Sequence, residues 1–261
     1  MEIWIMSGAG NDFAVLDARG KQLDLRQMAI DLCNRYGTDG LLAADVSDCA
    51  DFRLHFYNAD GLRGEMCGNG ARCICKFAFE NGLAGETMTV QTDAGLICGQ
   101  RLEDTRYRVK LNPPGIVDLH RRPDAAYIEL GDPGIPHSVT EIPGMKWEDR
   151  EALLPRFLEI RHGEAFSKGV NVNFYARLSE SSVRILTYER GVEDFTLACG
   201  TGSACVAVVL YLKGLLPGNR LIAENPGGTL EITLGGDGNQ VTELYLEGPA
   251  VTVAKQILKN T

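Results

Sequence analysis

The chain has 261 residues, 44% of them hydrophobic, and a formal net charge of −9 at pH 7. Binding to nucleic acid or to an anionic membrane needs clustered Lys and Arg, and because no such cluster occurs, a small-molecule substrate is favoured. The N-terminal segment has an acid at Glu2 and no basic flank before an apolar core. We therefore expect no signal peptide and a cytoplasmic location, and we expect the uncharged stretch 196–212 to be a buried core helix.

The first half of the chain alternates short strands with two helices. Apolar alternation predicts strands at 3–5, 13–16, 41–44, 52–57, 87–92, 95–98 and 107–111. Helical spacing predicts a helix over 25–36 that ends at Gly37. A second, more apolar helix is predicted after Cys67. Asn11 lies in a glycine-rich loop between the first two strands.

The second half repeats this alternation. Strands are predicted at 126–130, 170–175, 183–188, 221–223, 229–234 and 241–246. A helix is expected over 147–160, and another after Cys199. The segment 131–137 contains two prolines and two glycines, so we expect a stiff loop that delivers His137.

One cysteine motif occurs twice, at a constant offset. The segment 67–73 (CGNGARC) recurs as 199–205 (CGTGSAC), 132 residues further on. In each copy the first cysteine precedes a Gly-x-Gly at a helix start, where the positive end of the helix dipole stabilises a thiolate. The second cysteine of each copy, Cys73 or Cys205, is expected to be a small core residue. The repeat predicts one reactive cysteine in each half of the chain.

The repeat also predicts the fold class. Both halves run strand, cysteine helix, strands, which indicates an α+β protein of two pseudo-symmetric halves, each a mostly antiparallel sheet wrapped around a central apolar helix. We expect a first half-domain at 1–114 and a second at 115–249, with the site between them. The C-terminal segment, about 250–261, is a candidate to pack back on the first half.

Other side chains suggest the chemistry but leave alternatives open. Eight cysteines occur without a CxxC pair, and the four histidines lack ligand spacing, so we expect no metal. Glu189 could exchange a proton with the Cys199 thiol, and Arg190 could bind a substrate carboxylate. Cys67 and Cys199 could form a redox pair, or they could act as two proton-transfer groups on opposite sides of one carbon.

Several segments resemble the signatures of the diaminopimelate epimerase family. They are 58–61 (NADG), 66–73 (MCGNGARC), 188–191 (YERG) and 197–202 (LACGTG), with GAGNDF at 8–13 and Pro136-His137 as further matches. The resemblance spans almost the whole chain, in the family's order. It implies the fold described above and a cofactor-independent inversion of an amino-acid Cα by two cysteines. The implied reaction converts LL- to meso-diaminopimelate in lysine and cell-wall precursor synthesis, with no pyridoxal phosphate.

The resemblance also implies a role for each site residue. Cys67 and Cys199 would transfer the proton, with His137 and Glu189 as their respective acid/base neighbours. The residues implied to bind the substrate are Gly68, Asn69, Gly200 and Thr201 at its α-carboxylate, together with Asn11, Asn58, Asn171 and Arg190, the last three around its far end.

Departures from the family pattern concern that far end. Ile135 stands where many members have Asn, Gly40 where some have Gln, and 62–64 (LRG) where Ser-Glu-Ala is usual. An apolar residue in place of an amide weakens discrimination for a polar substrate end. Racemisation of another amino acid, such as histidine, is therefore the alternative, and a thiol redox protein or a catalytically silent binding protein is more remote. A homodimer is a candidate assembly.

Overall fold

The computed structural model describes residues 1–64, 67–132 and 134–258. Met66 of the first cysteine motif and Pro133 of the segment before His137 lie outside these ranges. Two compact units are formed, one by Met1–Lys110 with the C-terminal segment from Glu247, the other by Leu111–Leu246. The second unit begins at Leu111, a few residues before the boundary expected at 114. Pro114 already begins a strand that pairs within the second unit.

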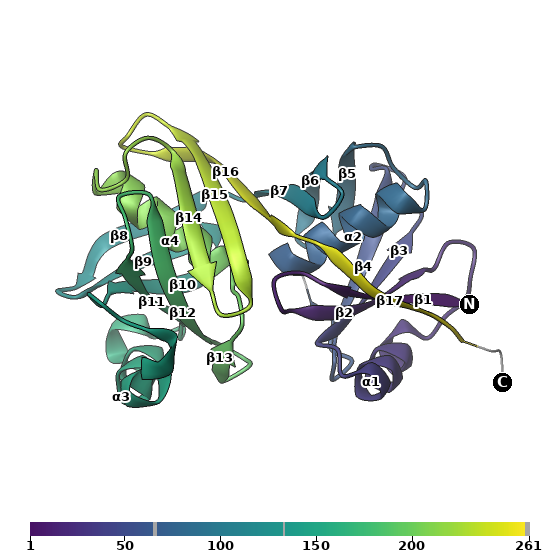
Figure 1. Ribbon diagram of the computed structural model, residues 1–261, viewed down its shortest axis with the longest axis horizontal. Coiled ribbons are helices and arrows are strands. Elements are labelled where there is room, and N and C mark those ends of the chain that lie inside the picture. The colour runs from purple at the N-terminus through teal and green to yellow at the C-terminus, as the bar shows by residue number, and fades with distance from the viewer. Residues whose placement is uncertain (65–66, 133, 259–261) are drawn as a thin grey trace. The chain divides into compact units, whose positions relative to one another are not determined.

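The described part of the first unit contains two helices and eight strands. In chain order they are β1 (Glu2–Ser7), β2 (Asp12–Asp17), α1 (Leu25–Tyr36), β3 (Gly40–Asp45), β4 (Phe52–Asn58), α2 (Gly68–Glu80), β5 (Thr87–Thr92), β6 (Gly95–Glu103), β7 (Arg106–Leu111) and β17 (Val251–Ile257). β1 pairs antiparallel with both β2 and β17, which brings the last strand beside the first (Figure 1). Parallel pairs occur only at β2–β3 and β4–β5 among the pairings described in this unit, each joined by a helix.

Two helices lie against this sheet in different ways. Asp24 caps α1 by accepting a hydrogen bond from the Gln27 N–H, and the helix ends at Gly37 with φ 67°. α1 buries only one stripe, including Ala29 and Leu32, against β2 and β3. α2, in contrast, is buried from Gly68 to Ala78 and contacts β1, β2, β3 and β6, so it is the central helix of the unit.

Among its described residues, the second unit contains two longer helices, two 3₁₀ turns and nine strands. They are β8 (Pro114–Arg122), β9 (Ala125–Gly131), β10 (Gly134–Glu141), η1 (Trp147–Asp149), α3 (Arg150–Arg161), η2 (Glu164–Phe166), β11 (Asn171–Arg177), β12 (Ser182–Glu189), β13 (Asp194–Thr196), α4 (Gly200–Leu212), β14 (Arg220–Asn225), β15 (Gly228–Gly236) and β16 (Val241–Pro249). The connections repeat those of the first unit: a parallel pair across α3, an antiparallel pair β11–β12, and a parallel pair across α4. The predicted pseudo-symmetric α+β fold is confirmed.

One predicted element is wrong. His137 does not follow a loop, because it lies inside β10 between β9 and β11. Pro136 is tolerated in this strand because β11 begins opposite His137, so Pro136 has a strand neighbour on one side only. His137 is therefore held in the sheet by a neighbouring strand on each side.

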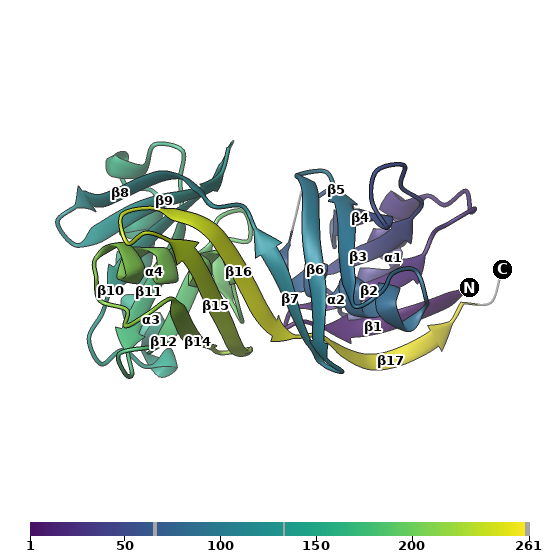
Figure 2. The same cartoon turned by 90° about the horizontal axis from the view of Figure 1, so that it is seen from above.

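α4 is the buried helix expected from the stretch 196–212. Its residues from Gly202 to Leu210 are buried, and it contacts β9, β10, β11, β14 and β15 (Figure 2). Within the described ranges of the chain, no helix has the length and apolar character needed to cross a bilayer. α3 covers the other face of β11, where Phe157 stacks on Phe174 with ring centroids 3.8 Å apart.

We predict that Phe157→Ala destabilises the second unit by about 3–5 kcal/mol, because the Phe157 ring is fully buried and its removal leaves a cavity. Urea unfolding followed by circular dichroism measures the change. Val192→Ala, at a side chain that is 57% exposed, is the control and should change the free energy of unfolding little. A loss below about 1 kcal/mol for Phe157→Ala would contradict this description of the core.

Candidate functional site

Cys67 lies at the N-cap of α2, in extended conformation (φ −133°, ψ 120°), and its side chain is partly exposed. The Gly68 and Asn69 N–H groups follow in the first turn, where a helix has no internal acceptors for them. The Cys67 thiol donates to Oδ1 of Asn11 at 3.5 Å. The first unit thus places a thiol beside a helix N-terminus suited to an anion.

Asn11 is itself held in place by Asp39. Its Nδ2 donates to Oδ2 of Asp39 at 2.6 Å, and the Asp12 N–H donates to the same oxygen at 2.8 Å. The loop before Asn11 packs on the start of α2, since a Cβ on Gly8 would lie 2.9 Å from the Asn69 carbonyl oxygen. Glycine at position 8 therefore lets the loop carry Asn11 to Cys67.

Asn58 ends β4 with an exposed side chain, opposite Gly40 in the β3–β4 register. Two of the departures from the family pattern are explained by the neighbouring Phe56 ring. A Cβ on Gly40 would lie 2.9 Å from this ring, and a Cβ on Gly64 would lie 2.3 Å from it. Glycine at both positions makes room for Phe56, which makes an edge contact with Phe13.

Cys199 is the N-cap of α4, also in extended conformation (φ −111°, ψ 110°), and is buried. Its sulfur accepts a hydrogen bond from the Gly202 N–H at 3.3 Å and lies 3.5 Å from Oγ1 of Thr201. A backbone donor and a helix N-terminus both favour the thiolate form of this side chain. The two cysteines of the repeat thus occupy equivalent places in their units.

Glu189 is the last residue of β12, and Arg190 comes directly after it. Burial raises the pKa of Glu189 above its usual range, and the neighbouring Thr196 side chain partly opposes this shift. Thr196 belongs to β13, which pairs with β12 and leads directly into the segment of Cys199. The Arg190 backbone N–H donates to Oδ1 of Asn171 at 2.8 Å, and its exposed side chain donates through Nη1 to the Lys168 carbonyl.

His137 is fully buried and lies between two amides. Nδ2 of Asn173 is 3.2 Å from His137 Nδ1, and Nδ2 of Asn171 is 3.5 Å from Nε2. Burial, with a smaller effect from the positive charge of Arg190, lowers the pKa of His137 to about 3. The imidazole is therefore neutral at physiological pH.

Asn173 was not singled out by the sequence analysis. Its Nδ2 also donates to the Ser138 carbonyl at 2.9 Å, and its Oδ1 accepts from the Thr187 hydroxyl at 3.0 Å. A Cβ on Gly202 would lie 2.1 Å from this Oδ1, so glycine at the start of α4 gives the amide its space. The alternation of Asn171 and Asn173 on one strand face was the available signal.

The structure therefore joins the predicted residues into one group within each unit. In the first unit, Asn11 and Cys67 meet at the start of α2. In the second, hydrogen bonds connect Arg190 to Asn171 and place the Asn171 and Asn173 amides beside His137, and the Asn173 amide packs against Gly202 at the start of α4. Asn58 lies apart from these contacts, at the end of its strand.

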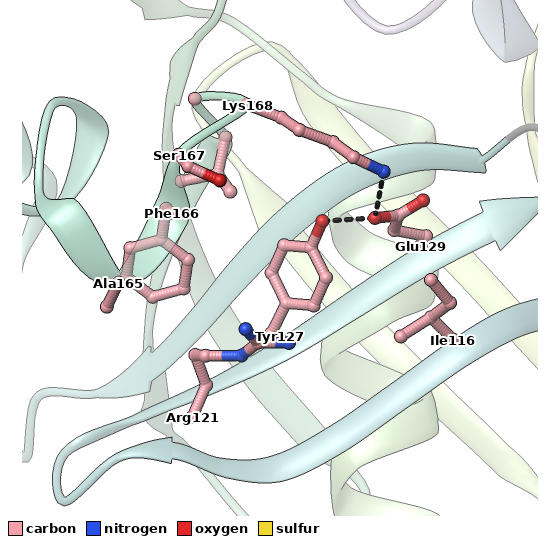
Figure 3. A pocket seen from close by; sticks show the side chains of 10 residues that line it. Ile116, Arg121, Tyr127, Glu129, Ala165, Phe166, Ser167 and Lys168 are labelled. Atoms are coloured by element: carbon pink, nitrogen blue, oxygen red, sulfur yellow. Dashed lines mark hydrogen bonds and ion pairs between the residues drawn. The ribbon is translucent and has the colours of Figure 1, made fainter.

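A separate cavity of about 200 Å³ lies in the second unit (Figure 3). Glu129 lines it and accepts hydrogen bonds from the Tyr127 hydroxyl and from Lys168 Nζ, while Arg121 lies over the Tyr127 ring. None of the predicted site residues lines this cavity. Across residues 1–64, 67–132 and 134–258, no three His, Cys, Asp or Glu side chains gather as a metal site.

We predict that neutral His137 makes stability depend on pH. Because its folded pKa is about 3 and its unfolded pKa about 6.5, the unfolded state binds an extra proton between these values, so stability falls as pH decreases from about 6.5 toward 3. The His137 contribution lost at pH 5 is about 2 kcal/mol. Urea unfolding at pH 7.5 and 5 should show this loss in the native protein and in His120→Gln, at an exposed position, but not in His137→Gln. An equal loss of stability in the native protein, His120→Gln and His137→Gln would contradict the role of His137.

Sequence comparison identifies relatives of this chain along nearly its whole length. The family model described as diaminopimelate epimerase matches residues 3–116 and 131–253. The chain is 34% identical to the diaminopimelate epimerase of Aquifex aeolicus, over 97% of this chain and 96% of the relative. It is also 34% identical to the enzyme of that name from Methanothrix thermoacetophila, over 100% of this chain and 96% of the relative.

Solved structures show the same fold at lower identity. A phenazine biosynthesis protein of the PhzF family from Bacillus anthracis aligns with a TM-score of 0.75 at 14% identity, over 99% of each chain. A probable proline racemase from Agrobacterium radiobacter aligns with a TM-score of 0.72 at 15% identity, over 99% of this chain and 92% of the other. Since the sequence relatives cover nearly the whole chain, the protein belongs to the diaminopimelate epimerase family and is an isomerase of that family.

Proposed function

We propose that the protein interconverts LL- and meso-diaminopimelate by moving a proton between Cα and two cysteines. The observation that carries this proposal is that Cys67 and Cys199 both stand at the N-cap of a glycine-initiated, buried helix. A thiolate on one face of Cα removes the proton, and a thiol on the other face returns one, which inverts the centre. Lysine synthesis is the pathway with which the family is associated.

Binding of the α-carboxylate supplies the electrostatic stabilisation that such a reaction needs. The Cα–H bond of an amino acid is weakly acidic, and negative charge builds on the carboxylate as it breaks. Backbone N–H groups at Gly68 and Asn69, and at Gly200 and Thr201, start the two helices and are suited to hold this group. No added cofactor is required in this scheme.

The acid/base neighbours support the same assignment. We assign His137 to Cys67 and Glu189 to Cys199. His137 is neutral at physiological pH, but its pKa of about 3 disfavours protonation, so its place beside Cys67 is supported by the family resemblance rather than by this pKa. The raised pKa of Glu189 brings this carboxyl closer to the pH at which it can both give and take a proton.

The far end of diaminopimelate carries a second ammonium and a second carboxylate. Arg190 presents an exposed guanidinium, which is suited to a bidentate contact with that carboxylate. Asn171 holds the Arg190 backbone through a 2.8 Å hydrogen bond and keeps its amide beside His137. With Asn58 and Asn11, these residues complete the set that we assign to substrate binding.

Ile135 favours a second candidate, the racemisation of another amino acid such as histidine. It precedes His137 by two positions in β10, so the two side chains leave the same face of the strand. An apolar side chain there offers no hydrogen bond to a polar substrate end. The inversion chemistry would be unchanged in this candidate, and only the far end of the substrate would differ.

We predict that Cys67→Ala and Cys199→Ala each reduce epimerisation of diaminopimelate by at least about a hundredfold, because one face of Cα loses its proton-transfer group. Solvent deuterium entering Cα in D2O, followed by NMR, measures the reaction. Cys98→Ala, at an exposed cysteine in β6, is the matched control and should keep native activity. Near-native turnover in both directions by either single variant would exclude the two-cysteine mechanism.

The substrate is tested by Arg190→Met. Loss of a charge-assisted contact of about 1.5–3 kcal/mol should lower kcat/KM for diaminopimelate about ten- to a hundredfold. Histidine has no distal carboxylate, so the loss of this contact should not lower kcat/KM for its racemisation. The value of kcat/KM for histidine is therefore the internal control. A native protein that turns over histidine and ignores diaminopimelate would overturn the substrate while leaving the cysteine mechanism in place.

A further inference from the structure

The single imidazole hydrogen of His137 has two places to go, and its neighbours decide between them. A neutral imidazole carries one hydrogen, on Nδ1 or on Nε2, and its other nitrogen accepts a hydrogen bond. His137 is fully buried, and burial keeps it neutral at physiological pH by lowering its pKa. Burial does not choose between the two tautomers, because both are uncharged. The choice falls to the polar groups in contact with the ring.

The first of these groups is the Asn173 amide, whose orientation is fixed by other partners. Its Oδ1 accepts from the Thr187 hydroxyl at 3.0 Å, and its Nδ2 donates to the Ser138 carbonyl at 2.9 Å. Turning the amide over would bring Oδ1 against the Ser138 carbonyl, where neither oxygen is a donor. The second hydrogen of Nδ2 is shared by Nδ1 of His137 at 3.2 Å and the Asn171 carbonyl at 3.3 Å. Asn173 therefore presents an N–H to Nδ1 of the ring.

The second group is the Asn171 amide on the other side of the ring. Its Oδ1 accepts from the Arg190 backbone N–H at 2.8 Å, which leaves Nδ2 facing Nε2 of His137 at 3.5 Å. Both ring nitrogens thus face an amide N–H, although a neutral imidazole can accept at only one of them. The shorter distance, at Nδ1, marks the hydrogen bond, so the imidazole hydrogen lies on Nε2.

The Nε2 hydrogen has no acceptor in the hydrogen bonds of the described residues. Its neighbour there is Nδ2 of Asn171, which is itself a donor. A buried donor without an acceptor costs free energy, and a group that brings an acceptor recovers it. The charge of Arg190, which acts on His137 along with burial, is also positive. This side of the ring is therefore suited to an anionic acceptor.

We propose that Asn173 fixes His137 as the tautomer with hydrogen on Nε2, so that His137 serves the reaction as a neutral hydrogen-bond donor and not as a base. The proposal rests on the two-cysteine function above and refines the part of His137 in it. The Cα proton is taken up by one cysteine and replaced from the other, while His137 keeps its hydrogen throughout. Asn173 is a positioning residue, because it acts through His137.

Nitrogen NMR of the free protein tests the tautomer directly. The protein is labelled with 15N in its histidine rings, and long-range correlations from the ring C–H groups are recorded at pH 7. The chain has four histidines, and the signals lost in His137→Gln identify those of His137. We expect a bare, downfield nitrogen at Nδ1 and a hydrogen-bearing nitrogen at Nε2. A bare nitrogen at Nε2 would overturn the proposal, and this measurement on the native protein needs no Asn173 variant to fold.

The role of Asn173 is tested by Asn173→Ala. Asn171 is then the remaining amide donor at the ring, so the hydrogen should move to Nδ1 and the bare nitrogen should become Nε2. The matched control is Asn225→Ala, at another buried asparagine, whose Nδ2 donates to the Ala223 carbonyl. It should leave the His137 signals unchanged. Signals of His137 that stay native in Asn173→Ala, or move equally in Asn225→Ala, would reject the role of Asn173.

Turnover tests whether the tautomer matters to the reaction. Asn173→Ala should lower kcat for diaminopimelate at least about tenfold, because a donor aimed at developing negative charge is lost. KM should change less, and Asn225→Ala should keep native kcat. A native kcat in Asn173→Ala with a switched tautomer would overturn His137 as a donor in the reaction. Because the spectra are recorded without substrate, inactivity of the native protein on diaminopimelate would reject the proposed substrate and leave the tautomer assignment in place.

Discussion

The structure depends on one constraint, the enclosure of a helix by a sheet in each unit. α2 and α4 are buried along most of their length, so their backbone hydrogen bonds are satisfied internally except in the first and last turns. At the first turn the N–H groups need an acceptor from outside the helix. In both helices a cysteine precedes this turn, so a sulfur lies beside backbone N–H groups that have no acceptor within the helix.

Glycine makes this arrangement possible at both helix starts. Gly8 lets a loop touch the first turn of α2, and Gly202 leaves room for the Asn173 amide at α4. The buried polar side chains then fill the remaining space with hydrogen bonds to neutral groups. Arg72 binds two carbonyls and an amide, and His137 lies between two amides. Buried polar groups of this kind favour a single arrangement of the surrounding side chains, because other arrangements would leave a hydrogen-bond donor or acceptor unpaired.

Much of the fold could be predicted because local pattern and tertiary packing agree. α1 has helical spacing, a capping Asp24 and a terminal Gly37, and α4 is an uncharged stretch that follows the repeated cysteine motif, so local features were sufficient to predict both. β10 was missed because Gly134 and Pro136 are typical of a loop, and only the register with β9 and β11 makes this segment a strand. β13 has three residues, too few for a pattern. Strands of this kind are stabilised by neighbours distant in sequence.

The sequence by itself determined the repeat, the two N-cap cysteines and the family, because each is a local feature in which spacing along the chain decides the chemistry. Tertiary structure alone decided that Arg72 is buried against neutral oxygens, that Asn173 joins His137 to the start of α4, and that Phe56 fills the space left by Gly40 and Gly64. These features join residues far apart in the chain. Their energies depend on burial and on distances between atoms, which no spacing in the sequence contains.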